Sequence, residues 1–261
     1  MSSPIRLSVL PLLGAAVALA AGVPARAEQA RPAPIVVSVA ASLADVMSDL
    51  ARRHEQATGQ PVRLNVGGSN FLARQIVEGA SADVFVSADE AQMDVAEHAG
   101  RLVPGSRAPL LTNRLVVVGR PGGGLVVRDA AALAGDAVRR VALGNPDSVP
   151  AGVYARRWLE GRGIWAQVAP KVVPTVTVRA ALAAARAGRV DAAVVYATDA
   201  ATEPLLPVLL AVPAGETPPI VYPVAVVAGR RQDAAARFVT FLRSPAAAAV
   251  FAAAGFGVVG R

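Results

Sequence analysis

The chain has 261 residues, of which 54% are hydrophobic and 17% are charged, and it contains no cysteine. This composition excludes a disordered chain, a disulfide-stapled small domain and a collagen-like repeat, and it removes thiolate metal sites and thiol catalysis. The formal net charge of +7 comes from scattered arginines, and aromatic residues make up only 4% of the chain. Because no basic stripe is interleaved with aromatic side chains, we expect no nucleic-acid partner.

The first 27 residues have the pattern of a secretory signal peptide. Arg6 precedes an apolar run over residues 7–22, and Pro24 and the small-residue pattern Ala25-Arg26-Ala27 follow it. The run is shorter than the roughly 20 residues that a membrane-spanning helix needs. We therefore expect cleavage near Ala27, export to the periplasm, and no lipid anchor, since such an anchor requires a cysteine.

Beyond this segment, strand-like apolar runs alternate with amphipathic helical segments, which is typical of an α/β fold with mainly parallel strands. Strands are predicted at residues 35–40, 62–66, 83–86, 114–118, 140–142, 192–196 and 220–227. Apolar residues recur at helical spacing at residues 43–51, 72–77, 89–98, 150–159, 178–187, 233–242 and 245–254.

Several predicted helices begin beside a hydroxyl side chain or a tight turn. Ser42, Ser69 and Thr177 stand at three such starts, and residues 149–151 form a turn before a fourth. A helix N-terminus presents unpaired N–H groups and a partial positive charge, so several that converge would bind an anion without a cationic side chain. Taken singly, each hydroxyl has the alternative role of a plain helix cap.

Motifs for catalysis are incomplete. Lys171 is the single lysine and does not lie in a phosphate-binding loop, and neither His54 nor His98 belongs to a His-Glu-x-x-His helix. A serine hydrolase would need one of these histidines as a base, and both are expected to be ordinary surface residues. We therefore expect no enzyme, and a secreted serine hydrolase stays open as the weaker alternative.

Five blocks of sequence, in order, carry a more specific signal. They are VAASL at 39–43, GSN at 68–70 followed by LARQI at 72–76, ADVFVSAD at 82–89, VPAGVY at 149–154, and YPVAVV at 222–227. Together they resemble the periplasmic molybdate-binding proteins of ABC transporters, and the resemblance runs from about residue 35 to residue 257. It implies a two-lobed α/β periplasmic binding protein of type II, in which each lobe is a mainly parallel sheet flanked by helices. Lobe one would comprise residues 28–110 and 223–261, and lobe two residues 111–222.

The resemblance also implies how the ligand is held in the cleft between the lobes. A tetrahedral dianion would be bound by two serine hydroxyls, by backbone N–H groups and by one tyrosine hydroxyl, with no charged side chain in contact. These groups would belong here to Ser42, Ser69, Ala151, Val178 and Tyr196. Tyr154 and Tyr222 are expected to be packing residues, and Asn70 either adds an amide donor or only shapes its turn.

The implied function is high-affinity periplasmic binding of molybdate or tungstate and delivery to the membrane permease of an ABC transporter. We expect a monomer that needs no cofactor, with molybdenum present only as the bound oxyanion. A pocket of donors without a carboxylate acceptor suits proton-free dianions, so phosphate should bind weakly. Sulfate should be rejected by its size and tungstate hardly distinguished. A binding protein for sulfate or a related tetrahedral oxyanion, and a scaffold whose serines only cap helices, remain as alternatives.

Overall fold

The computed structural model describes residues 32–259, which belong to one compact unit. The predicted signal peptide, residues 1–27, and its cleavage site lie outside the described residues. None of the helices in the described range has both the length and the hydropathy needed to cross a bilayer.

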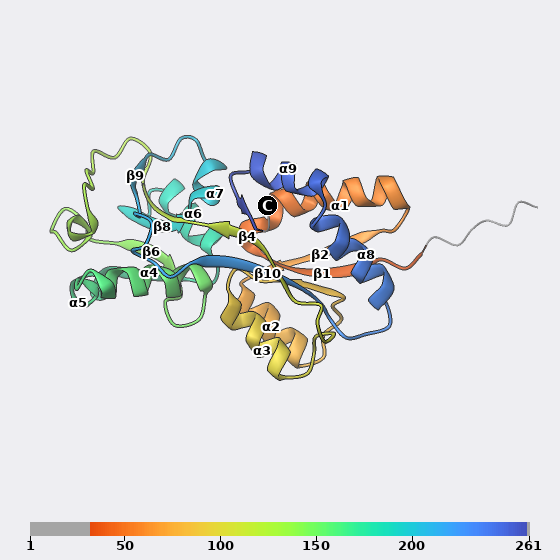
Figure 1. Ribbon diagram of the computed structural model, residues 1–261. Coiled ribbons are helices and arrows are strands. Elements are labelled where there is room, and N and C mark those ends of the chain that lie inside the picture. The colour runs from red at the N-terminus through yellow and green to blue at the C-terminus, as the bar shows by residue number, and fades with distance from the viewer. Residues whose placement is uncertain (1–31, 260–261) are drawn as a thin grey trace, which may run out of the picture. The chain divides into compact units, whose positions relative to one another are not determined.

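The described residues form two sheets flanked by helices (Figure 1). The first sheet has the order β11-β4-β10-β3-β1-β2, and the second has the order β7-β6-β8-β5-β9. The strands are β1 (Ile35–Ala40), β2 (Val62–Gly67), β3 (Val84–Val86), β4 (Ala108–Asn113), β5 (Leu115–Gly119), β6 (Val141–Gly144), β7 (Val172–Thr175), β8 (Ala192–Tyr196), β9 (Val208–Ala211), β10 (Ile220–Val226) and β11 (Gly257–Val258).

The helices occupy most of the connections between these strands. They are η1 (Ala41–Leu43), α1 (Ala44–Thr58), α2 (Ser69–Val77), α3 (Glu90–His98), η2 (Ala130–Leu133), α4 (Pro150–Gly161), α5 (Trp165–Val168), η3 (Ala169–Lys171), α6 (Val178–Arg186), α7 (Ala197–Ala201), α8 (Gln232–Leu242) and α9 (Pro245–Ala253). In the first sheet, α1, α8 and α9 lie on one face, and α2 and α3 lie on the other (Figure 1).

The first sheet is buried on both faces because its strand residues alternate between two cores. Val37 and Val39 of β1 belong to the core on the side of α1, whereas Phe85 of β3 packs with Leu72 and Met93 in a second cluster under α2 and α3. Successive side chains of a strand point to opposite faces, so a strand covered by helices on both sides reads as a continuous apolar run. This is why β1 could be predicted so closely from the sequence.

The prediction of mainly parallel sheets is corrected by the strand pairing, because both sheets are mixed. In the first, β1 pairs in parallel with β2 and β3, whereas β10 pairs antiparallel with β3 and β4. In the second, β6 pairs in parallel with β7 and β8, whereas β5 is antiparallel to β8 and β9. The parallel pairs come from strand-helix-strand units, and the antiparallel pairs come from the strands through which the chain passes from one sheet to the other and returns.

Four strands, β4, β7, β9 and β11, were not predicted from the sequence. β4 and β7 each contain a proline, and β11 has only two residues. The four residues of β9 are all apolar, but β9 is a short, partly exposed edge strand that follows Pro207. Short edge strands and strands that contain proline give a weak signal in the sequence. The first sheet draws its strands from residues 35–113 and 220–258, and the second from residues 115–211. The lobe limits given above stay a prediction.

Candidate oxyanion-binding site

The carboxyl ends of six strands lead to one cavity. After β1, β2 and β3 of the first sheet, the chain contributes residues 40–42, 67–69 and 88 to its lining. After β6 and β7 of the second sheet it contributes residues 149–151 and 177–178, and β8 contributes its last residue, Tyr196. In open α/β sheets, ligands bind outside the carboxyl ends of parallel strands, where the following helices begin. The cavity therefore lies at the place where this fold binds small molecules.

All five residues that were expected to hold a ligand line this one cavity. They are Ser42, Ser69, Ala151, Val178 and Tyr196, which come from five different segments of the chain. The cavity has a volume of about 10 Å³, which is space for about one water molecule. The structure thus brings the five residues together, and their contact with a ligand stays a prediction.

Three of these residues stand in the first turn of a helix. Ser69 is the first residue of α2, Val178 the first of α6, and Ala151 the second of α4. The first four N–H groups of a helix have no partner within the helix, and they carry the positive end of its dipole. The hydroxyl of Thr177 caps α6, as predicted, by accepting from the N–H of Ala180 at 3.1 Å. The N–H of Val178 does not take part in that cap.

Ser42 differs from its expected role as a helix cap. It lies inside η1, is 3% exposed, and makes no capping hydrogen bond to α1, whose N-cap residue is Leu43. Its Oγ lies instead 3.1 Å from the hydroxyl oxygen of Tyr222. The hydroxyl of Ser42 is therefore held by a tertiary contact rather than by its own helix.

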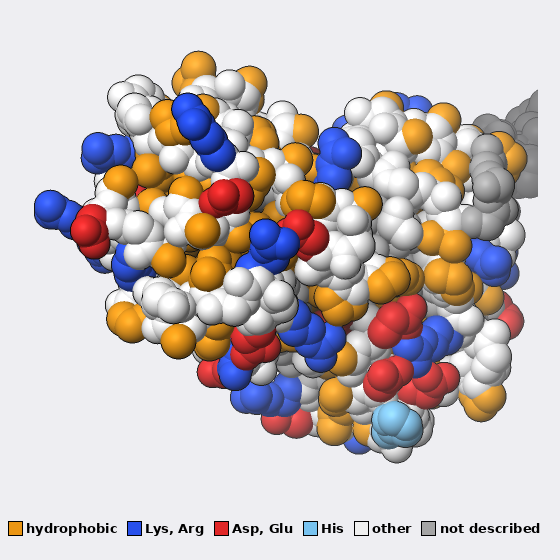
Figure 2. All heavy atoms as spheres, turned by 60° about the vertical axis from the view of Figure 1, so that its left-hand side comes forward, with side chains coloured by type: hydrophobic (Ala, Val, Ile, Leu, Met, Phe, Trp, Pro, Cys, Tyr) orange, Lys and Arg blue, Asp and Glu red, His pale blue; other side chains and the backbone are white. Residues whose placement is uncertain are grey.

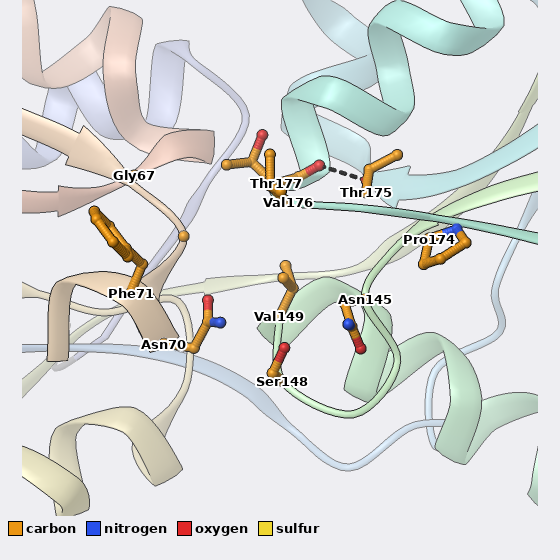
Figure 3. Close-up of a pocket in the computed structure, with 11 residues that line it drawn as sticks. Gly67, Asn70, Phe71, Asn145, Ser148, Val149, Pro174, Thr175, Val176 and Thr177 are labelled. Atoms are coloured by element: carbon orange, nitrogen blue, oxygen red, sulfur yellow. Dashed lines mark hydrogen bonds between the residues drawn. The ribbon is translucent and has the colours of Figure 1, made fainter. Parts of the chain in front are cut away.

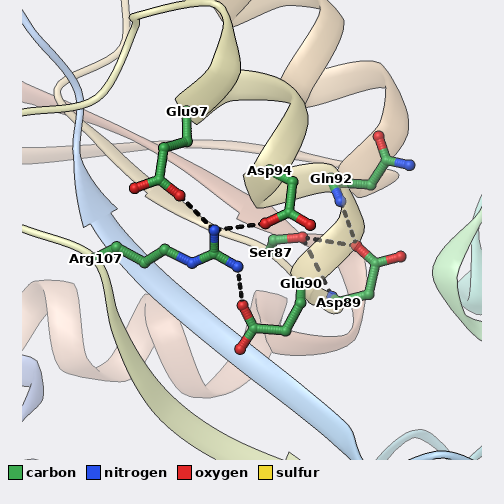
Figure 4. Close-up of polar contacts among 7 residues, drawn as sticks. All are labelled: Ser87, Asp89, Glu90, Gln92, Asp94, Glu97 and Arg107. Carbon is green, nitrogen blue, oxygen red and sulfur yellow. Dashed lines mark hydrogen bonds and ion pairs between the residues drawn. The ribbon is translucent and has the colours of Figure 1, made fainter.

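Ser69 is held by the loop between β3 and α3. Its Oγ accepts a hydrogen bond of 3.0 Å from the backbone N–H of Ala88, so its own proton stays available to another acceptor. The loop is fixed on either side of Ala88, because Ser87 Oγ lies 3.3 Å from Asp89 Oδ1 and Asp89 caps α3 by accepting from the N–H of Gln92 (Figure 4). The fold therefore holds the backbone N–H of Ala88 in place as a donor to the Ser69 hydroxyl.

A cluster of ion pairs around Arg107 holds α3 against the segment that leads into β4. The Arg107 guanidinium forms ion pairs with Glu90, Asp94 and Glu97, which lie on one face of α3 (Figure 4). The carboxylates at positions 94 and 97 are 2.6 Å and 2.5 Å from Arg107. None of these four residues lines the cavity, so we assign the cluster a structural role.

The hydroxyl of Tyr196 is the unpaired group of the cavity. Tyr196 is 1% exposed, and its Oη has no hydrogen-bond partner within the described part of the chain. Burial, followed by the neighbouring Tyr222, raises the pKa of this phenol well above its usual value. The group therefore stays protonated and is a donor without an acceptor.

The cavity is uncharged. Its lining, as far as the structure describes it, contains only alanine, glycine, valine, proline, serine, threonine and Tyr196. The described residues also contain no group of three or more histidine and carboxylate side chains that could hold a metal ion. Arginine, lysine and acidic side chains are mixed over the outer surface, as one face of the molecule shows (Figure 2). What the cavity offers a ligand is hydrogen-bond donors, which suits an anion that accepts only.

A larger pocket of about 570 Å³ adjoins the cavity and shares Gly67, Gly68, Val149 and Thr177 with it (Figure 3). A Cβ at Gly68 would lie 2.7 Å from Asn70 Oδ1 and 3.0 Å from the carbonyl oxygen of Val176, so a larger residue there would have to displace its neighbours. Asn70 lines this larger pocket and not the small cavity, and its Oδ1 is buried without a partner among the described residues. The two readings of Asn70 as donor or turn residue thus both stay open.

The structure corrects two expectations from the sequence. His54 is not a surface residue: it is 3% exposed and its ring lies 5.0 Å from Phe238 and 5.1 Å from Phe241, and burial lowers its pKa. His98 is exposed, as expected, and neither histidine lines the cavity. Tyr222, expected to be only a packing residue, forms a hydrogen bond through its hydroxyl group with the hydroxyl of Ser42. No local signal in the sequence joins these residues, since 180 positions separate them.

Comparisons with known proteins identify the family of this chain. A family model for bacterial extracellular solute-binding proteins matches residues 35–257. The chain is 35% identical over 254 residues to the molybdate-binding protein ModA of Escherichia coli (strain K12), which covers 94% of this chain and 96% of that protein. The periplasmic molybdate-binding protein of Azotobacter vinelandii is 27% identical and superposes with a TM-score of 0.78 over 87% of this chain and 100% of its own.

A third similar structure is the sulfate-binding protein SubI of Mycobacterium tuberculosis, with a TM-score of 0.76 over 87% of this chain and 88% of that one. Its identity of 21% shows a shared fold alone.

Two sheets flanked by helices, with a cavity where their strands end, form the α/β fold of a periplasmic binding protein. The chain belongs to the bacterial extracellular solute-binding protein family, and the resemblance to molybdate-binding proteins that the five sequence blocks suggested is confirmed.

Proposed function

We propose that this protein binds molybdate or tungstate in the periplasm and delivers it to the membrane permease of an ABC transporter. The observation that carries the proposal is the uncharged cavity at which Ser42, Ser69, Ala151, Val178 and Tyr196 meet. The relative that is 35% identical over nearly the whole chain bears the name of a molybdate-binding protein, and the family is one of extracellular solute-binding proteins. The proposal requires no cofactor and no partner subunit.

The donors of the cavity suit an anion that carries no proton. Ser69 already accepts from the N–H of Ala88, and Tyr196 has no acceptor within the described chain, so both can donate to a ligand oxygen. Molybdate, tungstate and sulfate accept hydrogen bonds only. Hydrogen phosphate carries a proton that needs an acceptor, and without one that polar group would be buried unpaired. We therefore propose that phosphate binds weakly.

Size separates the proton-free dianions from each other. The oxygens of sulfate lie closer to the central atom than those of molybdate, so donors set for molybdate would be too distant for some of them, and hydrogen bonds weaken steeply with such misfit. Tungstate has nearly the dimensions of molybdate. The cavity of about 10 Å³ is too small for four oxygens, so we propose that the groups around it move apart to admit the ligand and close on it.

A sulfate-binding protein is the second candidate, because a protein with that name shares the fold and because the same donors serve sulfate. A serine hydrolase finds less support. The buried ring of His54 and the exposed His98 both lie outside the cavity lining, so neither serine has a histidine base beside it in that lining. We propose a binding role without catalysis.

The test is a thermal unfolding scan of the purified mature protein with equal concentrations of molybdate, tungstate, sulfate or phosphate. A ligand that binds only the folded state stabilises it by about 2.7 kcal/mol at one hundred times its dissociation constant, which raises the midpoint clearly. We expect molybdate and tungstate to raise the midpoint and phosphate to leave it unchanged. A rise with sulfate alone would favour the second candidate, and no rise with any oxyanion would remove the proposal.

A further inference from the structure

Ser42, one of the residues that line the cavity, belongs to a network of hydrogen-bonded side chains that do not all line it. Tyr222 of β10 is fully buried, and its hydroxyl oxygen lies 3.1 Å from Ser42 Oγ and 3.2 Å from Asn113 Nδ2. Asn113, the last residue of β4, also donates through Nδ2 to the hydroxyl of Thr198 at 2.9 Å. Neither Tyr222 nor Asn113 lines the cavity. The hydrogen bond from this network to the cavity lining is the contact with Ser42, and the Tyr222 ring also packs against Tyr196.

The direction of these bonds follows from the amide of Asn113. Its Oδ1 accepts from the backbone N–H of Arg114 at 2.9 Å, so its NH₂ group is the one that faces Tyr222. An amide NH₂ donates and cannot accept, so the proton of Tyr222 must go to another acceptor. Ser42 Oγ is the remaining partner of that hydroxyl within the described chain. Tyr222 therefore donates to Ser42, and the proton of Ser42 is free to point into the cavity.

Tyr196 carries the other hydroxyl group beside Tyr222. The two rings pack with their centroids 5.7 Å apart, and the Tyr196 hydroxyl acts to lower the pKa of Tyr222, yet Tyr196 Oη has no hydrogen-bond partner of normal geometry among the described residues. Ser42 Oγ, 3.1 Å away, is therefore the acceptor that we assign to the proton of Tyr222. The arrangement at Ser42 resembles that at Ser69, whose Oγ accepts from the N–H of Ala88. Each serine oxygen thus receives a hydrogen bond from the protein, which leaves each serine as a donor toward a ligand.

We propose that Asn113 and Tyr222 are positioning residues that set the selectivity of the site for proton-free dianions by holding Ser42 as a hydrogen-bond donor. This inference rests on the proposed function. Without the donor behind it, the Ser42 hydroxyl can rotate and turn a lone pair toward the cavity, where that lone pair accepts the proton of hydrogen phosphate. The loss of Tyr222 should therefore weaken the binding of molybdate and at the same time favour a proton-bearing anion.

The experiment compares the wild-type protein with Tyr222→Phe by calorimetry, with molybdate as the ligand and inorganic phosphate as the competitor. A mildly alkaline pH is used, because phosphate is then mainly a dianion and differs from molybdate in its proton and not in its charge. We expect a loss of about tenfold in molybdate affinity, as for one hydrogen bond to a charged group, and a molybdate-to-phosphate ratio at least tenfold lower. Equal losses for both anions, or no competition by phosphate in the variant, would overturn the proposal.

Tyr154→Phe is the matched control. Tyr154 is 6% exposed and does not line the cavity, so the same change of a buried tyrosine should leave the affinity ratio unchanged. Asn113→Asp is a second variant, which reverses the direction of these hydrogen bonds. A carboxylate at position 113 accepts the proton of Tyr222, and Ser42 then donates to Tyr222. We expect its affinity ratio to fall at least as far as that of Tyr222→Phe.

The outcomes separate this inference from the proposed function. If the wild-type protein binds no oxyanion, both fail. If it binds molybdate and the ratio is the same in wild type, Tyr222→Phe and Asn113→Asp, only the role of Tyr222 and Asn113 fails. If the wild-type protein binds sulfate in place of molybdate, the ratio is measured with sulfate, because the argument concerns the proton and not the central atom.

Discussion

Tyr196 carries a hydroxyl group that folding buries without giving it a hydrogen-bond partner in the described chain. Burying such a group costs free energy, because its hydrogen bond to water in the unfolded chain is not replaced. A residue retained at this cost is expected where a ligand supplies the missing acceptor. Tyr196 ends β8 and lines the cavity, so the residue that bears this cost belongs to the proposed site.

The variant Tyr196→Phe tests this interpretation. We expect the ligand-free protein to become more stable by about 1 kcal/mol, because the variant no longer buries an unpaired hydroxyl, and we expect the affinity for molybdate to fall. Urea unfolding without ligand measures the first effect, and calorimetry measures the second. A variant that is less stable than the wild-type protein would show that the hydroxyl has a partner in the folded chain.

Among the elements, the start of α4 depends on one close approach to a strand. A Cβ at Gly152 would lie 1.9 Å from the carbonyl oxygen of Gly144, the last residue of β6. The missing side chain lets the first turn of α4 lie directly against the strand. Ala151, which lines the cavity, precedes Gly152 in that turn, so we expect the same approach to position the Ala151 N–H for a ligand.

We therefore expect Gly152→Ala to affect stability and binding together. The added methyl group must push α4 away from β6, which should lower the free energy of unfolding by about 2 kcal/mol and weaken molybdate binding. The matched control is Gly161→Ala at the other end of α4, where nothing lies within 4 Å of the added Cβ. Thermal unfolding and calorimetry on both variants measure the effects. A Gly152→Ala protein with wild-type stability and affinity would contradict the expected clash.

At the scale of the whole molecule, a buried carboxylate links the stability of the fold to pH. Asp199 of α7 is fully buried and lies 2.6 Å from Arg179 Nε of α6, and Arg179 Nη2 also lies 2.7 Å from Asp45 of α1. Burial raises the pKa of Asp199 to about 6, although the charge of Arg179 acts in the opposite direction. In the unfolded chain the same group titrates near its ordinary value of 3.8.

The sign of the effect follows from where the proton is bound. Between the unfolded and the folded pKa, the folded protein holds a proton that the unfolded chain has lost, so stability falls as pH rises through this window and levels off above about pH 6. We expect Asp199→Asn to remove this contribution. Urea unfolding of both proteins at a series of pH values should give a wild-type stability, relative to the variant, that declines across the window. A difference that does not change with pH would contradict the raised pKa.

Part of the cavity lining was recognisable in the sequence, because Ser69 and Ala151 stand at starts of helices that follow predicted strands and Val178 follows the predicted cap Thr177. Ser42 lies in one of the five sequence blocks, whereas Tyr196 lies in none of them and came from the resemblance as a whole. Their contact with a ligand stays a prediction. The central strands were equally visible, since strands covered on both faces are continuous apolar runs. Edge strands such as β7 and β9 gave a weaker signal, because each has only four residues, β7 contains a proline and β9 is partly exposed.

Only the tertiary structure decided how these residues are held. Asn113, Tyr222 and Ser42 lie on three separate elements, and no periodicity or spacing of the chain joins them. The same holds for the buried ring of His54, which a polar helical segment made to look exposed. Local sequence determines where helices and strands begin, because backbone hydrogen bonding and side-chain periodicity are short-range. Partners across the fold depend on how the two sheets pack, and that arrangement is set by all of the contacts together.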